Sequence, residues 1–477
     1  MIKVSTAFYF WLFTLSVILI LILAPLIQDG VFMDGMLYIS VGKNLSEGIG
    51  TFWNQSFSKT CMFEYHEQPP LYGGLIAVFF KLFGDSIYTE RLFCFSFLIA
   101  TYFVIVKLWK LILPNSVNTK HNWLPVVYFS IIPVVFWAFQ NHVEETVMTL
   151  FDLTAVYFIY YTIKKDKHAL IYLFLCAFFI YLASLTKGLQ GLFPLSALPL
   201  SWLINRDRKK LNQIILQTIY LLVCFVLLYL FTFLIFDQAY SSFEKYFSIR
   251  LINTFNHVGS TTENRFYLLF KLFAELSPVF ILTALLFFLS RKKNHLQVTN
   301  ESKKICVWLL LIGISGSLPL MVTLEQRGFY LVTSLPFYCL AFALLSYYYI
   351  VELLQKTIFI VSIINFLKAF TIVLFFSSCI YFFVSIGKTK RDKELLHDVY
   401  LCKTFMQKGE VIGIPEAMWN DWNIQTYMVR HHYISLSMGK TNKYYIIRKD
   451  LEKNLVPKSY TEKKLPTKFF DVYELIR

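Results

Sequence analysis

The sequence predicts an all-α polytopic membrane protein of about eleven transmembrane helices, with a small C-terminal α/β domain. Of its 477 residues, 57% are hydrophobic and 18% aromatic, and the mean hydropathy is +0.55. A soluble domain of this length could not bury so much apolar surface in one core, so lipid is the expected solvent. Long apolar stretches recur through residues 1–386 and are absent from 387–477.

Eleven stretches approach the roughly 20 mostly apolar residues that a membrane-spanning helix needs. They are 6–27, 87–112, 123–140, 146–163, 168–186, 189–204, 212–236, 267–289, 305–324, 328–351 and 357–386. The first could be mistaken for a signal peptide. Because it is long and no small-residue cleavage pattern follows before Pro25, we interpret it as a retained anchor.

The connections between these stretches alternate between basic and non-basic. The basic connections carry Lys107, Lys110 and Lys120; Lys164, Lys165 and Lys167; Arg206, Arg208, Lys209 and Lys210; and Arg291, Lys292, Lys293, Lys303 and Lys304. Because cytoplasmic loops are enriched in Lys and Arg, we predict a cytoplasmic N-terminus and an extracytoplasmic C-terminal domain. The same clustering accounts for the net charge of +15, so nucleic acid is not expected as a partner.

Two segments outside the spans are predicted to fold on the outer side. The first, 28–86, contains two helical patterns at 33–45 and 71–83 that we place at the membrane interface. The second, 387–477, is predicted to form a helix at 392–407 and strands at 411–414, 433–438, 444–448 and 469–475. We therefore divide the chain into a transmembrane domain, 1–386, and a small domain, 387–477.

The eight cysteines show no spacing typical of zinc ligands. Six of them fall in or beside apolar stretches, where a small buried hydrophobe is expected. Cys61 and Cys402 lie in polar segments on the predicted outer, oxidising side. Whether these two form a disulfide is left open by the sequence.

The first candidate site residues are Asp34 and Tyr38, which share one helix face at i and i+4. The alternative role for Asp34 is an N-cap of that helix. His66 and Gln68 form a second polar group, just before Pro69 and Pro70. His66 with Glu64 and Glu67 could bind a metal, but three such neighbouring residues rarely converge.

The third candidate group lies at the start of the fourth span, where His142, Glu144 and Glu145 follow one another closely. The helix dipole explains one acidic residue there, but not two. Lys187 lies between two spans on the outer side, where it could anchor the helix by snorkelling or hold a lipid phosphate. Arg91 and Arg327 are similar outer cations.

Taken together, a carboxylate base and cations for a phosphate leaving group are what a transferase needs. A transporter instead places ionisable residues at mid-span and breaks helices there. The clearest mid-span charge in the sequence is Lys368, which stands alone, so the pattern argues against transport.

The order of these motifs resembles the GT-C membrane glycosyltransferases, in particular the bacterial branch similar to lipid A aminoarabinose transferases and protein O-mannosyltransferases. The motifs are Asp34-Gly35-x-x-Tyr38, Asn44-Leu45-x-x-Gly48, Gln68-Pro69-Pro70-Leu71, Phe83-Gly84-Asp85-Ser86, Arg91-Leu92, Gln140-Asn141-x-x-Glu144, Leu185-Thr186-Lys187-Gly188 and Arg327-x-x-Tyr330 with Pro336. The resemblance covers most of residues 1–350.

This resemblance implies transfer of a sugar from a polyprenyl-phosphate carrier to a lipid, glycan or protein, on the outer face of a bacterial inner membrane. It implies Asp34 as the catalytic base, Glu144 as a second acid with Glu145 as the fallback, and Lys187 and Arg327 as ligands of the carrier phosphate. No cofactor is implied with certainty, and a divalent cation is left open.

The sequence departs from the family pattern at three positions. Gly35 replaces a frequent Glu, Gln68 replaces a His or Lys, and the second acid is Glu144 rather than Asp. Two other functions stay open. One is an oligosaccharide polymerase or ligase, for which Arg250, His257 and Arg265 in one outer loop are a faint signal. The other is a lipid or solute transporter.

Overall fold

The computed structural model describes residues 6–113, 121–164, 168–206, 211–252, 261–290, 298–354 and 359–476. Several residues used above fall outside these ranges, namely Lys120, Lys165, Lys167, Arg208, Lys209, Lys210, His257, Arg291, Lys292 and Lys293. The side chain of Arg250 is not described either. The chain forms two compact units, and each is treated separately.

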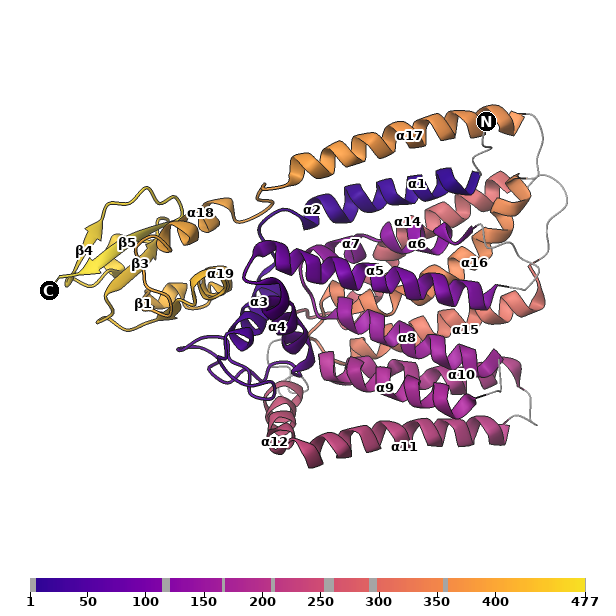
Figure 1. Cartoon of the computed structure of the whole chain (residues 1–477), viewed down its shortest axis with the longest axis horizontal. Helices are drawn as coiled ribbons and strands as arrows, with labels where there is room; N and C mark the ends of the chain where they lie inside the picture. The colour runs from indigo at the N-terminus through magenta and orange to yellow at the C-terminus, as the bar shows by residue number, and fades with distance from the viewer. Residues whose placement is uncertain are drawn as a thin grey trace. The chain divides into compact units, whose positions relative to one another are not determined.

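Unit 1 comprises residues 1–26, 94–140 and 144–386, and the regular segments that the structure describes in it are helices (Figure 1). Its helices are α1 Thr6–Ile18, η1 Leu19–Leu23, α2 Ala24–Leu26, most of α5 Ile87–Ile112, α6 Trp123–Ser130, α7 Pro133–Gln140, α8 Glu145–Lys164, α9 Ala169–Lys187, η3 Gly188–Ser196, α10 Ala197–Asn205, α11 Leu211–Ile235, α12 Asp237–Tyr246, η5 Phe247–Leu251, α14 Tyr267–Ser290, α15 Asn300–Ser317, η6 Leu318–Val322, η7 Gly328–Thr333, α16 Leu335–Leu354 and α17 Phe359–Ser385.

Among the described residues, nine helices are long and apolar enough to cross a membrane, and there are ten if the bent pair α6 and α7 forms one span. One of the nine is the 37-residue stretch Ala169–Asn205. The prediction of eleven spans counted this stretch as two spans. In the structure, the chain reverses its direction within the stretch. Gly188 has φ +64°, and a Cβ on Gly191 would lie 2.7 Å from the carbonyl carbon of Ala183.

Large apolar side chains cover the outward faces of several unit 1 helices. On α11 and α17, Leu234 is 82% exposed and Phe366 is 70% exposed. Soluble proteins rarely expose so much contiguous apolar surface, so these faces are suited to lipid. The predicted all-α membrane architecture is therefore confirmed.

Unit 2 comprises residues 27–93, 141–143 and 387–477. Both helices predicted in the first outer segment are present, as α3 Met33–Ser46 and α4 Leu71–Phe83. They pack against each other, and α3 also packs against α19, Trp422–His432. Most of α3 is buried, from Gly35 to Asn44, so within unit 2 it is a core helix.

The C-terminal part of unit 2 is a five-stranded mixed sheet with the order β2-β1-β3-β5-β4 (Figure 1). The strands are β1 Val411–Gly413, β2 Ser435–Ser437, β3 Tyr444–Arg448, β4 Tyr460–Lys463 and β5 Phe470–Leu475. The first three strands are parallel, and β5 pairs antiparallel with β3 and β4. The predicted helix is present as α18, Lys393–Cys402. The structure also contains α19 and β4, which were not predicted from the sequence. Cys61 and Cys402 are both free thiols.

Candidate active site

Asp34 lies in the first turn of α3 in unit 2, and its side chain is half-buried. The N-cap of α3 is Phe32, whose backbone N–H donates to the Oδ1 atom of Asn141 at 3.0 Å. The suggestion that Asp34 caps this helix is therefore wrong. Asn141, rather than Asp34, therefore accepts a backbone hydrogen bond at the start of α3.

Gly35 explains one departure from the family pattern. A Cβ atom at this position would lie 1.8 Å from the backbone oxygen of Asn141, far inside van der Waals contact. A glutamate could not be accommodated without moving the start of α3. Gly35 thus permits the close contact between α3 and Asn141 that fixes the position of Asp34.

An aromatic cluster surrounds the same part of unit 2. The ring of Tyr38 meets that of Tyr72 edge to face at 5.6 Å, and the Tyr72 hydroxyl donates to the His142 carbonyl oxygen at 2.8 Å. The His142 ring stacks on Phe93 at 6.0 Å. Tyr38 and His142, both predicted as site residues, therefore belong to one packed cluster.

His142 is fully buried and has a left-handed backbone, with φ +55°. Among the described residues, neither of its ring nitrogens has a hydrogen-bond partner. Burial, reinforced by the positive charges of Arg91, Lys390 and Arg430, lowers the pKa of His142 well below its usual value. The imidazole is consequently neutral at physiological pH.

Unit 1 contains a second cluster, formed by Glu144, Glu145 and Lys187. The Lys187 ammonium lies 2.5 Å from Glu145 Oε1 and 3.7 Å from Glu144 Oε2, and all three residues are buried. It also lies over the ring of Tyr330, 4.7 Å from the centroid. With both acids ionised, this buried cluster has a net charge of −1.

The segment that supplies Tyr330 is also tied into unit 1. The backbone oxygen of Tyr330 accepts a hydrogen bond from Gln190 at 2.7 Å, and its hydroxyl donates to Glu325 at 3.4 Å. Arg327, the N-cap of η7, is exposed. Of the cations predicted to bind phosphate, Arg327 is exposed, whereas Lys187 is already engaged by carboxylates.

Arg91 is buried in an ion network of unit 2. Its guanidinium lies 3.3 Å from Glu90 and 3.8 Å from Asp29, and it donates to the Gln28 carbonyl at 3.0 Å. Glu90 also contacts the buried Arg430 of α19 at 2.5 Å. This network links the start of α5 to α19 within unit 2.

The same network contains residues that the sequence analysis did not single out. Arg430 contacts Asp85 at 2.8 Å, and Asp85 contacts the buried Lys43 at 3.0 Å. Although burial raises the pKa of the Asp85 carboxyl, the charges of Arg430 and Lys43 outweigh this and lower it. The sequence signal that could have identified this network is Lys43, a charged residue within the largely apolar pattern of α3.

His66 is buried, and its Nε2 atom lies 3.9 Å from Glu64. Within the described ranges, no group of three His, Cys, Asp or Glu residues could hold a metal ion. Gln68 is half-buried just before the turn into α4, where Gln55 donates to the Pro70 carbonyl at 2.7 Å. These two residues lie in the irregular segment between α3 and α4.

The expectation that Lys368 would be the clearest mid-span charge is wrong. Asp152 lies within α8 and is fully buried, and no hydrogen bond to its carboxyl oxygens is found among the described residues. Glu275 lies within α14 and accepts a hydrogen bond from the backbone N–H of Val134 at 2.6 Å. Lys271 lies 3.0 Å from the same carboxylate.

Comparisons with known proteins place this architecture in a class. Residues 67–236 match the model of the dolichyl-phosphate-mannose-protein mannosyltransferase family. No curated protein matches the sequence. The fold is similar to that of ArnT from Cupriavidus metallidurans bound to undecaprenyl phosphate, with a TM-score of 0.69 and 12% identity over 98% of both chains. The apo state of that protein matches with a TM-score of 0.66, at the same identity and coverage.

A weaker likeness is found to the oligosaccharyltransferase AglB of Archaeoglobus fulgidus, with a TM-score of 0.46 and 12% identity over 90% of this chain and 64% of that one. The two ArnT matches, each over 98% of both chains, show that the fold is ArnT-like. The resemblance inferred from the sequence motifs is confirmed, and the chain is a multi-pass membrane protein.

Proposed function

We propose that this protein transfers a sugar from a polyprenyl-phosphate carrier to an acceptor on the extracytoplasmic side of a bacterial inner membrane. The ArnT-like fold over 98% of both chains and the family match at residues 67–236 support this proposal. Its N-terminus is proposed to be cytoplasmic, and the acceptor is a lipid, a glycan or a protein.

In the proposed reaction, an acceptor hydroxyl attacks the anomeric carbon of the lipid-linked sugar. The bond from that carbon to the phosphate oxygen breaks, and the polyprenyl phosphate leaves with the bonding electrons. Asp34 accepts the proton of the attacking hydroxyl, as a general base. A single direct displacement of this kind inverts the anomeric configuration.

The observation that carries the role of Asp34 is the anchoring of its helix. The Asn141 side chain accepts a hydrogen bond from the Phe32 N–H, and the Asn141 backbone packs against Gly35. The first turn of α3 therefore has little freedom to shift. A base must be held within a fraction of an ångström of its productive position, because misplacement reduces the rate steeply. Tyr38, one turn further on, is proposed to line the substrate site beside it.

We propose different roles for the two outer cations. Arg327 is exposed and would neutralise the carrier phosphate, for which a guanidinium is well suited. Lys187 would instead hold the Glu144 and Glu145 carboxylates in position, since it is already paired with both. Glu144 would then orient the acceptor, with Glu145 as the fallback.

Replacing the base tests this proposal. Asp34→Asn is expected to lower transfer by about 10²- to 10⁴-fold, the usual contribution of a general base. The matched control is Asp237→Asn, because Asp237 is also acidic, lies in the first turn of α12 and is exposed. Transfer at the wild-type rate by a folded Asp34→Asn protein would refute the role of Asp34.

A second experiment identifies the substrates. Envelope lipids and glycans from cells with and without the protein are compared by mass spectrometry. We expect one lipid, glycan or protein to lose the mass of a single sugar when the protein is absent. An unchanged envelope under conditions in which the protein is made would contradict the proposed activity.

A further inference from the structure

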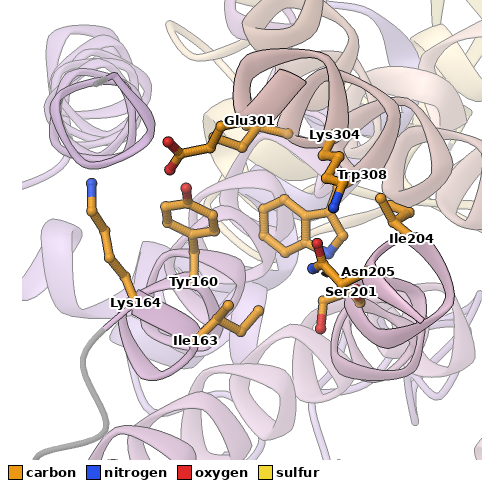
Figure 2. Close-up of a pocket in the computed structure, with 10 residues that line it drawn as sticks. Tyr160, Ile163, Lys164, Ser201, Ile204, Asn205, Glu301, Lys304 and Trp308 are labelled. Atoms are coloured by element: carbon orange, nitrogen blue, oxygen red, sulfur yellow. Dashed lines mark hydrogen bonds between the residues drawn. The ribbon is translucent and has the colours of Figure 1, made fainter. Parts of the chain in front are cut away.

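A pocket lies in unit 1 where α8, α10 and α15 come together (Figure 2). Its volume is about 200 Å³, and its polar or aromatic lining residues are Tyr160, Lys164, Ser201, Asn205, Glu301 and Trp308, with Lys304 at the same edge. This pocket is separate from the Glu145 cluster. Both lie on α8, but the 19 residues from Glu145 to Lys164 correspond to about 28 Å of helix.

The pocket lies at the end of the helices that the sequence predicts to be cytoplasmic. Lys164 is the last residue of α8, Asn205 is the last residue of α10, and Lys304 lies in the first turns of α15. Each of these helix ends adjoins one of the basic connections. A membrane phospholipid headgroup would be found at this depth, where aromatic rings such as Trp308 are favoured.

The walls of the pocket are held by hydrogen bonds to the backbone. Trp308 donates to the Ala197 carbonyl at 2.9 Å, Ser201 to Leu198 at 2.7 Å, and Asn205 to Ser201 at 3.0 Å. Trp308 is 3% exposed and Tyr160 is 8% exposed, so the aromatic base of the pocket is fixed. The charged residues, by contrast, reach its exposed mouth.

The charges at the mouth are Lys164, Lys304 and Glu301, for a net charge of +1. Figure 2 shows the Glu301 carboxylate and Lys164 on the Tyr160 side, and Lys304 on the Trp308 side. Lys164 uses one of its three N–H donors on the Leu111 carbonyl, at 2.5 Å. The remaining ammonium donors of Lys164 suit a phosphodiester, the charge of Lys304 adds to the positive potential at the mouth, and Glu301 suits an N–H or O–H donor on the same ligand.

We propose that this pocket binds the headgroup of a membrane phospholipid that carries a phosphodiester and a hydrogen-bond donor, such as ethanolamine or glycerol. The volume of the pocket is consistent with the size of a headgroup. It is more than tenfold the roughly 10–15 Å³ that one water needs, yet it is below the roughly 300–1,000 Å³ of pockets that enclose whole drug-sized ligands.

The test is lipid retention by the full-length protein in nanodiscs, measured by native mass spectrometry. We expect retention of phosphatidylethanolamine and phosphatidylglycerol, and weaker retention of phosphatidylcholine, whose headgroup has no N–H or O–H donor. Lys304→Ala and Lys164→Ala should weaken retention of all three lipids by up to about fivefold, as expected for partly exposed ion pairs.

The matched control is Lys303→Ala, which removes the same charge one residue away from the pocket and should leave retention unchanged. Glu301→Ala should abolish the preference over phosphatidylcholine. The proposal is overturned if Lys304→Ala and Lys303→Ala behave alike, or if the three lipids are retained equally by the wild type. It is also overturned if soluble glycerophosphoethanolamine binds as tightly as the lipid, since the ligand would then be a free phosphodiester.

Discussion

The ammonium group of Lys187 pairs with two buried carboxylates, those of Glu144 and Glu145. Removing one member of a buried ion pair usually destabilises a protein by about 3–5 kcal/mol, because the remaining charge stays buried without compensation. We expect Lys187→Met to reduce the free energy of unfolding by about this amount, measured by denaturant unfolding in detergent.

A double variant separates charge from packing in this cluster. Lys187→Met combined with Glu145→Gln removes one charge of each sign, so part of the lost stability should return. If the double variant is less stable than Lys187→Met alone, the pairing does not explain the burial of Lys187.

His142 gives unit 2 a pH dependence. Its folded-state pKa lies well below 6.5, mainly because of burial, so below pH 6.5 the unfolded chain binds a proton that the folded chain does not. The contribution of His142 to the free energy of unfolding is therefore fully present above about pH 6.5. Below that pH it decreases by about 1.4 kcal/mol per pH unit for each such histidine. His431, whose pKa is lowered for the same reason, adds a similar contribution.

Two histidines with left-handed backbones provide the variant and its control. His142→Asn should retain only the pH dependence due to His431, because Asn tolerates φ +55° and does not titrate. His168 also has a left-handed backbone, with φ +64°, but it is exposed, so His168→Asn is the matched control for the substitution itself. Thermal unfolding at pH 7.5 and 5.5 measures both, and equal slopes in the two variants would contradict the account.

At single positions, local patterns in the sequence singled out Asp34, Glu145 and Lys187 as candidate site residues, because each interrupts or borders an apolar stretch, and their roles stay predictions. The same patterns could not reveal that Asn141 caps a helix that begins over one hundred residues earlier. Nor could they reveal the ion pair of Arg91 with Asp29, because Asp29 lies in a distant segment of the sequence.

Among the helices, α7 depends on a carboxylate from another element. The span formed by α6 and α7 bends by 79°. Pro133 opens α7, and Glu275 of α14 accepts the Val134 N–H at 2.6 Å, which satisfies a donor that the break leaves without a helical partner. This broken helix and its buried acid are accounted for by capping, so they do not by themselves favour a transporter.

Replacing the capping carboxylate tests this interpretation of α7. Glu275→Ala should lower the free energy of unfolding by about 0.5–2 kcal/mol, as lost helix caps do, or more because the site is buried. Glu275→Gln keeps an oxygen acceptor for Val134 and should cost less. Equal losses in both variants, measured by denaturant unfolding, would show that hydrogen bonding to Val134 is not the reason for this residue.

The elements that the sequence predicted are those with strong periodicity, such as α3, α4, β3 and β5. The helix α19 was missed because its sequence, WNIQTYMVRHH, mixes polar and apolar residues, and Arg430 and His431 within it are nonetheless buried. The strand β4 was missed because its sequence, YTEK, is short and charged, as is common for an edge strand.

For the whole molecule, composition and charge were sufficient to predict a helical membrane protein, and the order of motifs predicted its GT-C fold. Orientation stays a prediction, since it rests on loop charges, several of them outside the described residues. The grouping of residues 27–93 and 141–143 with the C-terminal segment was not predictable, because it arises from contacts between distant segments.

The proposed reaction breaks the bond between a sugar and its lipid phosphate carrier. The most direct measurement incubates the purified chain with a labelled polyprenyl-phosphate sugar and an envelope extract, and follows free polyprenyl phosphate and glycosylated product together. We predict that both appear in equal amounts, with the anomeric configuration inverted in the product. A lipid-linked sugar that stays intact with every acceptor fraction, or that only crosses the membrane of a vesicle, would contradict this account.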